Sequence, residues 1–233
     1  MELVYYVSIV AQALTYASFL SGARVCHSIY KQKSSAKLSP MPFLAGFNCA
    51  ALWLRYGYLA NEREIIVVNT IGLSCSINYL AFFVIYSKQK KRLLKQLLGL
   101  VAFLMTLFYS INKSTDPLFL SGSLASISSL LACASPLATI QDVFQTKCTA
   151  SLPFPIIASS FAVSLSWLTF GYLKDDSFIV FSNIVAVAIS GAQLLLFLIF
   201  PSIQQGDIQL QEKLIPPPTN RTGNNSNSNG NKK

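Results

Sequence analysis

Two tryptophans and two asparagines stand at matching positions along the chain. Trp53 and Trp167 are 114 residues apart, and so are Asn69 and Asn183. An indole presents an apolar ring face and one N–H donor, and a carboxamide presents donors and an acceptor without net charge. Gathered in one site, these groups favour a neutral polyhydroxyl ligand over an ion. The alternative is structural: tryptophan in an interfacial belt and asparagine bonding between helices.

The chemistry expected of such a site is binding without catalysis. The apolar stretches hold no acidic residue near their centres, and the lone His27 lies toward the end of the first stretch, where a structural role is the simpler interpretation. Proton coupling normally uses an intramembrane carboxylate or histidine. The chain also lacks a G-x-x-x-x-G-K-[ST] loop for ATP. We therefore expect a ligand to cross the membrane passively, without coupling to protons or ATP. We expect no enzyme activity and no metal or cofactor.

The 114-residue offset extends well beyond these four residues. Trp53, Leu54, Gly57, Tyr58 and Leu59 match Trp167, Leu168, Gly171, Tyr172 and Leu173, and Lys33, Ala36 and Leu38 match Lys147, Ala150 and Leu152. Tryptophan occurs only twice in the chain and both copies take part, so composition alone does not explain the match. The pattern predicts an internal repeat.

Composition places this repeat in a membrane. Hydrophobic residues make up 52% of the 233 residues and charged residues only 12%, whereas about a quarter of the residues in a soluble domain are charged. A helix needs roughly 20 apolar residues to cross a bilayer. Seven stretches qualify, at about 4–28, 40–60, 65–86, 95–111, 118–141, 152–173 and 177–200. The first is too long and lacks the basic start of a cleaved signal peptide.

The net charge of +9 is divided unequally between the two sets of loops. The connections after the first, third and fifth stretches, together with the tail, carry most of the lysine and arginine, and the other loops are net acidic. Short cytoplasmic loops carry the positive excess, so we predict the N-terminus outside and the C-terminus in the cytoplasm. The orientation of the chain in the bilayer thus explains its positive charge, and no nucleic-acid partner is expected. None of the five cysteines lies in an outward loop, so no disulfide is expected.

The repeat and the helix count together define the architecture. The predicted fold is an all-α integral membrane protein in which helices 1–3 map onto helices 5–7 and the fourth is a linker, a 3+1+3 arrangement. Both triplets start in the same direction, so the copies are parallel, and a substrate is expected near the midplane between them. The predicted parts are 1–87 (first repeat), 88–113 (basic loop and linker helix), 114–201 (second repeat) and 202–233 (disordered cytoplasmic tail).

Several short motifs accompany this architecture. They are Ser135-Pro136-Leu137, Gln145-Thr146-Lys147, Trp167-x-x-x-Gly171-Tyr172 and Ser182-Asn183. In combination, over about residues 3–201, they resemble the SWEET sugar transporters, also called the nodulin/saliva family. The resemblance implies bidirectional, gradient-driven uniport of a mono- or disaccharide by alternating access, with a glucose-like hexose favoured. It implies a multi-pass protein of the cell membrane, or alternatively of the Golgi. Its partners are then the sugar and the lipid bilayer, and a homo-oligomer is an alternative to a monomer.

The resemblance also assigns residues to the pocket. The family's pocket asparagines fall on Asn69 and Asn183, and its pocket tryptophan falls on Trp167, with Trp53 in the matching position of the first half. The size of the ligand is expected to depend on neighbouring side chains. We predict this filter one turn before the tryptophans and one turn before Gly22 and Pro136, at Cys49, Val163, Ser18 and Ala132.

Hinges and a gate follow from the same resemblance. The family's outer gate, a tyrosine hydrogen-bonded to an aspartate, falls on Tyr56 and Asp176. Its hinge prolines fall on Pro42, Pro136 and Pro153, and the fourth position is Gly22. Glycine there resembles animal members and provides a flexible point without a fixed kink. The alternative for the prolines near residues 42 and 153 is that they simply start helices.

Two other functions are compatible with seven helices. A retinal-binding receptor needs a lysine in the last helix, and 177–200 contains none. The usual seven-helix receptors also show no triplet repeat. A PQ-loop carrier of another small solute normally contains Pro-Gln dipeptides, and none occurs here. A sugar uniporter is therefore the favoured hypothesis, with the carrier and the receptor as its alternatives.

Overall fold

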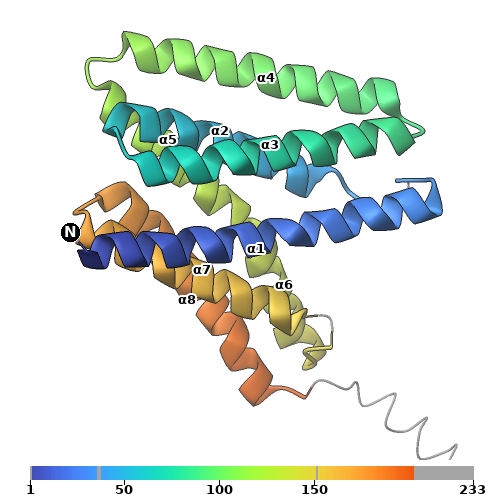
Figure 1. The fold of residues 1–233 in the computed structure, drawn as a ribbon. Coiled ribbons are helices and arrows are strands. Elements are labelled where there is room, and N and C mark those ends of the chain that lie inside the picture. The colour runs from blue at the N-terminus through green and yellow to red at the C-terminus, as the bar shows by residue number, and fades with distance from the viewer. Residues whose placement is uncertain (1, 36–37, 151, 202–233) are drawn as a thin grey trace, which may run out of the picture.

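The computed structural model describes residues 2–35, 38–150 and 152–201, and every regular element in these ranges is an α-helix (Figure 1). The helices are α1 (Glu2–Gln32), α2 (Met41–Ala60), α3 (Arg63–Tyr86), α4 (Lys90–Lys113), α5 (Pro117–Ala132), α6 (Ala134–Thr146), α7 (Phe154–Leu173) and α8 (Ser177–Ile199). The tail at 202–233, which the sequence predicts to be disordered, lies outside the described residues.

Six segments among the described residues are long and apolar enough to cross a membrane. They are α1, α3, α4, α7, α8 and Pro117–Thr146, which contains both α5 and α6. The remaining helix, α2, has 20 residues, includes Asn48 and Arg55, and is not among these six. It packs against α3, α4 and α5 within the bundle. The chain therefore has the seven crossings that the sequence predicts.

The crossings alternate in direction, so the connections gather at two ends of the bundle. In Figure 1 the N-terminus lies at the same end as the α2–α3, α4–α5 and α7–α8 connections, and the other connections lie at the opposite end. We call these ends the N side and the tail side. Both α1 and α5 run away from the N side, which is the relation that a parallel repeat requires.

Each half packs its first helix against the second helix of the other half. α1 contacts α7, and α5, the repeat counterpart of α1, contacts α2. Within each half the second and third helices form the most extensive pair, α2 with α3 and α7 with α8. The linker α4 lies along one flank, against α2, α3 and α5 (Figure 1). The interface between the halves is thus built twice from equivalent elements.

Three buried apolar clusters show where the halves join. The cluster that contains Tyr56 and Phe170 draws on both halves and surrounds the ends of α2 and α7 at the N side. The cluster around Phe83 comes from the first half and α4, and the cluster around Val143 comes from the second half. In Figure 1 the two halves diverge toward the tail side. The halves therefore share a core at the N side and have separate cores at the tail side.

The fifth crossing differs from its counterpart in the first half. The sequence predicts one helix over 118–141, but the structure divides this crossing at Cys133 into α5 and α6. Pro136 causes the division, because proline has no backbone N–H to donate and its ring crowds the preceding turn. At the equivalent position Gly22 leaves α1 continuous over 31 residues. Glycine at this position therefore does not interrupt the helix.

A side chain from the third helix of each half lies next to the position held by Gly22 or Pro136. Tyr79 on α3 donates its hydroxyl to the carbonyl of Phe19, at 2.7 Å. Gln193 on α8 stands 114 residues later and donates its amide to the carbonyl of Pro136, at 3.3 Å. The Tyr79 ring lies directly against Gly22, where a larger residue has no room. Close packing, and not only freedom of the backbone, therefore requires glycine at this position.

A lysine follows the tail-side end of the first crossing in each half. Lys33 and Lys147 follow α1 and α6 in the left-handed region, with φ of 52° and 54°. Each ammonium group lies near two aromatic rings, one on its own helix and one at the end of the third helix of the same half. The rings are Tyr30 and Tyr86 in the first half and Phe144 and Phe200 in the second. Such cation–π contacts are attractive, so each triplet is held together internally.

We expect Gly22→Ala to lower the thermal stability of the protein. The added Cβ falls on the Tyr79 ring, well inside contact distance, so Tyr79 must move and its bond to Phe19 is lost. Gly99→Ala on α4 is the matched control, because a Cβ there meets nothing within 4 Å. Alanine is favoured over glycine within a helix by about 0.5–1 kcal/mol, so the control keeps or raises the melting temperature. Equal melting temperatures for the two variants contradict this account.

Candidate functional site

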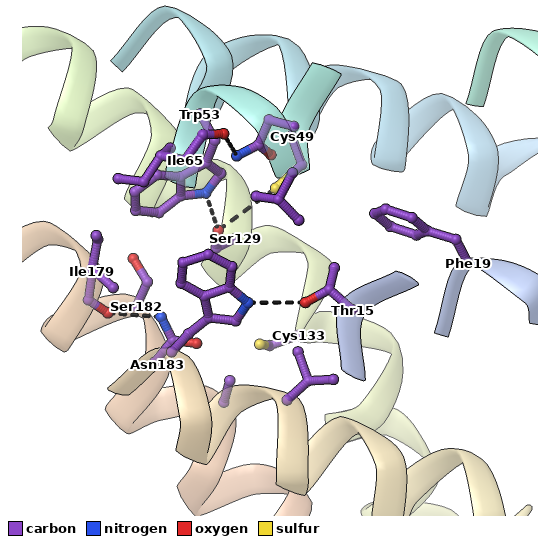
Figure 2. A pocket seen from close by; sticks show the side chains of 15 residues that line it. Thr15, Phe19, Cys49, Trp53, Ile65, Ser129, Cys133, Ile179, Ser182 and Asn183 are labelled. Carbon is purple, nitrogen blue, oxygen red and sulfur yellow. Dashed lines mark hydrogen bonds between the residues drawn. The ribbon is translucent and has the colours of Figure 1, made fainter. Parts of the chain in front are cut away.

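A cavity of about 300 Å³ lies between the two halves (Figure 2). It is formed by α1, α2 and α3 of the first half and by α5, α7 and α8 of the second, together with Cys133 at the break between α5 and α6. None of its lining residues is charged. They are Thr15, Phe19, Cys49, Trp53, Ile65, Val68, Asn69, Ser129, Cys133, Val163, Trp167, Ile179, Ser182, Asn183 and Ala186.

The lining is symmetric at the level of single residues. Fourteen of these residues form pairs at the 114-residue offset. The pairs are Thr15 with Ser129, Phe19 with Cys133, Cys49 with Val163, Trp53 with Trp167, Ile65 with Ile179, Val68 with Ser182, and Asn69 with Asn183. The cavity therefore lies on the axis that relates the two halves, where equivalent residues must meet.

The two tryptophans are held by hydrogen bonds that cross between the halves. Trp53 donates its indole N–H to the Ser129 hydroxyl, and Trp167 donates to the Thr15 hydroxyl, both at 2.9 Å (Figure 2). Each pair of partners is the repeat counterpart of the other. The indole N–H, which the sequence suggests as a donor to a ligand, is therefore used within the protein. The tryptophans are thus left with their ring faces as the surface available to a ligand.

The two asparagines are oriented by their own helices. Asn69 and Asn183 donate an amide N–H to the carbonyls of Ile65 and Ile179, one turn earlier, both at 2.8 Å. A carboxamide has a second N–H and an oxygen with two lone pairs. No bond within the protein is found for these groups among the described residues. Each asparagine can therefore donate and accept in the cavity while its side chain is held in place.

Two of the four residues predicted to form the size filter line the central cavity. Cys49 and Val163 line the cavity next to the tryptophans. Ser18 does not line it and bonds instead to the carbonyl of Thr15 on its own helix, at 2.7 Å. Ala132 lines a separate cavity within the second half. In this structure α1 and α5 turn other residues toward the central cavity.

Residues near Ser18 and Ala132 take the places predicted for them. Thr15 and Phe19 line the cavity from α1, and their counterparts Ser129 and Cys133 line it from the second half. These four residues were not predicted from the sequence. The available signal was a hydroxyl side chain in both copies, at Thr15 and at Ser129, inside otherwise apolar helices.

Polar contacts join the halves at the N side of the cavity. Tyr56, only 4% exposed, donates its hydroxyl to the Asp176 carboxylate at 2.8 Å. An ion pair of 2.8 Å joins Lys174 to Glu62 across the same gap. The two residues assigned to an outer gate are therefore in direct contact. Together with the shared apolar cluster, these contacts join the two halves at the N side of the bundle.

The predicted hinge residues occupy three kinds of position. Pro42 is in the first turn of α2, and Pro153 directly precedes α7. Pro136 follows the break between α5 and α6, and Gly22 lies inside continuous α1. The structure thus places two of the four at helix starts, which is the alternative that the sequence left open.

A known protein family matches this chain in two segments, which correspond to its two halves. The family model described as "Sugar efflux transporter for intercellular exchange" matches residues 5–91 and residues 119–205. These segments cover more than half of the chain and are themselves 114 residues apart. The chain belongs to the SWEET family. This multi-pass membrane protein thus contains two copies of the family's three-helix unit.

Relatives support the assignment over most of the chain. The protein named Sugar transporter SWEET1 of Drosophila pseudoobscura pseudoobscura is 35% identical over 210 residues, which are 87% of this chain and 92% of that protein. The Sugar transporter SWEET1 of Caenorhabditis elegans is 32% identical over 209 residues, 89% of this chain and 69% of its own. A solved structure of a eukaryotic SWEET transporter covers 84% of this chain and 95% of its own, with a TM-score of 0.78 at 24% identity. The last comparison establishes the fold.

We expect Asp176→Ala to destabilise this SWEET protein more than Asp116→Ala does. Both aspartates cap a helix: Asp176 accepts from Phe178 and Ile179 of α8, and Asp116 accepts from Phe119 of α5. Loss of such a cap costs about 1 kcal/mol. Only Asp176 also accepts from Tyr56, and a buried hydroxyl left unpaired costs about 1–3 kcal/mol more.

The measurement is the melting temperature of each purified variant in the same detergent. Tyr56→Phe isolates the contact between the halves, because it removes the bond to Asp176 and leaves the helix cap intact. It should lower the melting temperature less than Asp176→Ala. Indistinguishable values for Asp176→Ala and Asp116→Ala contradict a contribution from the contact.

Proposed function

We propose that this SWEET chain is a bidirectional, facilitative transporter of a neutral sugar, favouring a glucose-like hexose. The printed names of its relatives, sugar transporters and bidirectional sugar transporters among them, support the substrate class. The observation that carries the proposal is the cavity between the halves, where two indole faces and two carboxamides meet without any charged residue. Catalysis forms no part of the proposed activity.

The chemistry of the lining suits a sugar. A pyranose presents C–H groups on its faces and hydroxyls around its rim, and each hydroxyl both donates and accepts. Trp53 and Trp167 offer ring faces for the C–H groups, and Asn69 and Asn183 offer a donor and an acceptor each. A volume of about 300 Å³ is at the lower end of the range for small-molecule sites. It supports a monosaccharide over a disaccharide.

Alternating access is proposed from the unequal ends of the bundle. The contact between Tyr56 and Asp176 and the shared apolar cluster close the N side. Each half has its own apolar cluster at the tail side, so we assign this structure to a state whose cavity communicates with the tail side. In the opposite state the N-side contacts break and the tail-side ends approach. Gly22, Pro42, Pro136 and Pro153 are the proposed hinges.

Transport is proposed to be passive. The lining contains no carboxylate, imidazole or amine, which are the groups that couple transport to protons in a membrane. The orientation follows the distribution of lysine and arginine, with the N side outside and the tail side in the cytoplasm. The proposed location is the cell membrane, with the Golgi membrane as the alternative and a homo-oligomer as an alternative to a monomer.

The purified protein in liposomes is expected to take up labelled glucose without a proton gradient. Glucose preloaded inside the liposomes should accelerate entry of the label, because a bidirectional carrier returns with a loaded site. A protonophore should leave the rate unchanged. The controls are empty liposomes and the effect of unlabelled sugars on the uptake of label. A folded sample that shows no uptake of any sugar, or uptake that needs a proton gradient, contradicts the proposal.

Asn69→Ala and Asn183→Ala are each expected to reduce uptake about tenfold, because a lost hydrogen bond of about 1.4 kcal/mol corresponds to that factor. Asn78→Ala is the matched control. Asn78 donates to the carbonyl of Ser74 one turn earlier, at 2.8 Å, with the same local geometry as the cavity asparagines. It does not line the central cavity. Uptake reduced equally by all three substitutions contradicts a direct role for the cavity asparagines.

A further inference from the structure

A second cavity lies at the tail side of the first half, outside the central one. Its volume is about 430 Å³, and it is bounded by the α1–α2 connection, the end of α3, the α3–α4 connection and the first turns of α4. Its lining residues are Ser35, Leu38, Pro40, Met41, Phe83, Ser87, Lys88, Gln89, Arg92, Leu93 and Gln96. The cavity is thus at the depth where the helices of the first half leave the bilayer core.

The lining of this cavity is amphipathic. Phe83 and Leu93 are buried and form its apolar floor, 2% and 5% exposed. Leu38 and Met41 lie at the rim and are 37% and 59% exposed, so apolar surface continues from the cavity to the outside of the bundle. The polar side chains of the lining come from both connections and from the start of α4. They are Ser35, Ser87, Lys88, Gln89, Arg92 and Gln96. An occupant therefore needs both a polar part and an apolar part.

The polar part of the lining is cationic. Segment 87–96 contains five lysine or arginine residues and no aspartate or glutamate. Among the described residues, the hydrogen bond found for the Arg92 guanidinium is a long one, 3.5 Å to the side-chain oxygen of Gln89. The ion pair found in the described part of the chain, Lys174 with Glu62, lies at the opposite end of the bundle. Lys88 and Arg92 thus face the cavity without an anionic partner from the described residues.

We propose that this cavity binds an anionic phospholipid of the tail-side leaflet. Lys88 and Arg92 hold the headgroup phosphate by charge-assisted hydrogen bonds. The first turn of α4 adds the partial positive charge of a helix N-terminus. The acyl chains leave over Leu38 and Met41 into the bilayer. Basic pockets between transmembrane helices recognise anionic headgroups in this way.

The site belongs to one half only. The linker α4 supplies Arg92, Leu93 and Gln96, and the repeat has no second linker helix. A lipid in this place touches the start of α2 at Pro40 and Met41, next to the proposed hinge Pro42. It therefore joins α2, α3 and α4 at the end of the first half that lies apart from the second half.

The test uses the full chain in nanodiscs made of phosphatidylcholine alone or of phosphatidylcholine with phosphatidylserine. Phosphatidylserine should raise the melting temperature of the wild type. Lys88→Gln/Arg92→Gln should lose most of this rise. Lys90→Gln/Lys91→Gln should keep it, because it removes the same charge from residues that do not line the cavity. Equal loss in both variants indicates attraction by diffuse charge and overturns the proposal, as does an absence of any rise.

Two further measurements separate the remaining explanations. Soluble glycerophosphoserine added to phosphatidylcholine nanodiscs should produce no rise, and a rise equal to that with phosphatidylserine means a site for free phosphate esters and overturns the lipid assignment. A photoactivatable phosphatidylserine should label the wild type at Met41 or within residues 83–96. Labelling spread evenly over the lipid-facing helices overturns the proposal even where the Lys88→Gln/Arg92→Gln variant fails to fold.

Discussion

Three crossings of a membrane leave the chain on the side opposite to where it began. A second copy of the same triplet, joined directly, inserts upside down. The linker α4 adds one crossing, and this single constraint makes the two halves parallel. The halves then relate by an axis along the bilayer normal, and residues at the 114-residue offset meet on that axis. Duplication of one triplet thereby produces a cavity lined in pairs, to which each half contributes one tryptophan and one asparagine.

The same symmetry accounts for the way the halves hold each other. Each tryptophan bonds to a hydroxyl of the opposite half, so the bonds that fix the rings also join the bundle. A polar group buried without a partner is costly in a membrane, and these bonds satisfy four such groups at once. The lysine contacts at the tail side act only within a half. Each triplet therefore has lysine contacts and a buried apolar cluster of its own toward the tail side.

The two halves are not identical, and three differences between them affect the structure. Tyr56 bonds to Asp176, but the equivalent of Tyr56 is Phe170, which has no hydroxyl, so the contact forms once and not twice. Proline at 136 breaks the fifth crossing, and glycine at 22 leaves α1 continuous with Tyr79 packed against it. The linker α4 flanks one half and builds a cationic cavity there. The symmetry of the halves creates the central cavity. The differences between them determine the N-side contact, the break in the fifth crossing and the cavity beside α4.

Local sequence alone determined the seven crossings, the repeat, and the meeting of Trp53, Trp167, Asn69 and Asn183, because hydropathy and a fixed offset depend only on residue types and spacing. The contact of Tyr56 with Asp176 was available from the resemblance to the family. Tertiary structure decided the rest. The face that α1 turns toward the cavity depends on packing against distant side chains, such as that of Tyr79, which lies 57 residues after Gly22 and against it. As a result Thr15 and Phe19 line the cavity and Ser18 does not. The partners of the indole N–H groups come from the opposite half, so whether those groups are free for a ligand is settled only when the halves pack together.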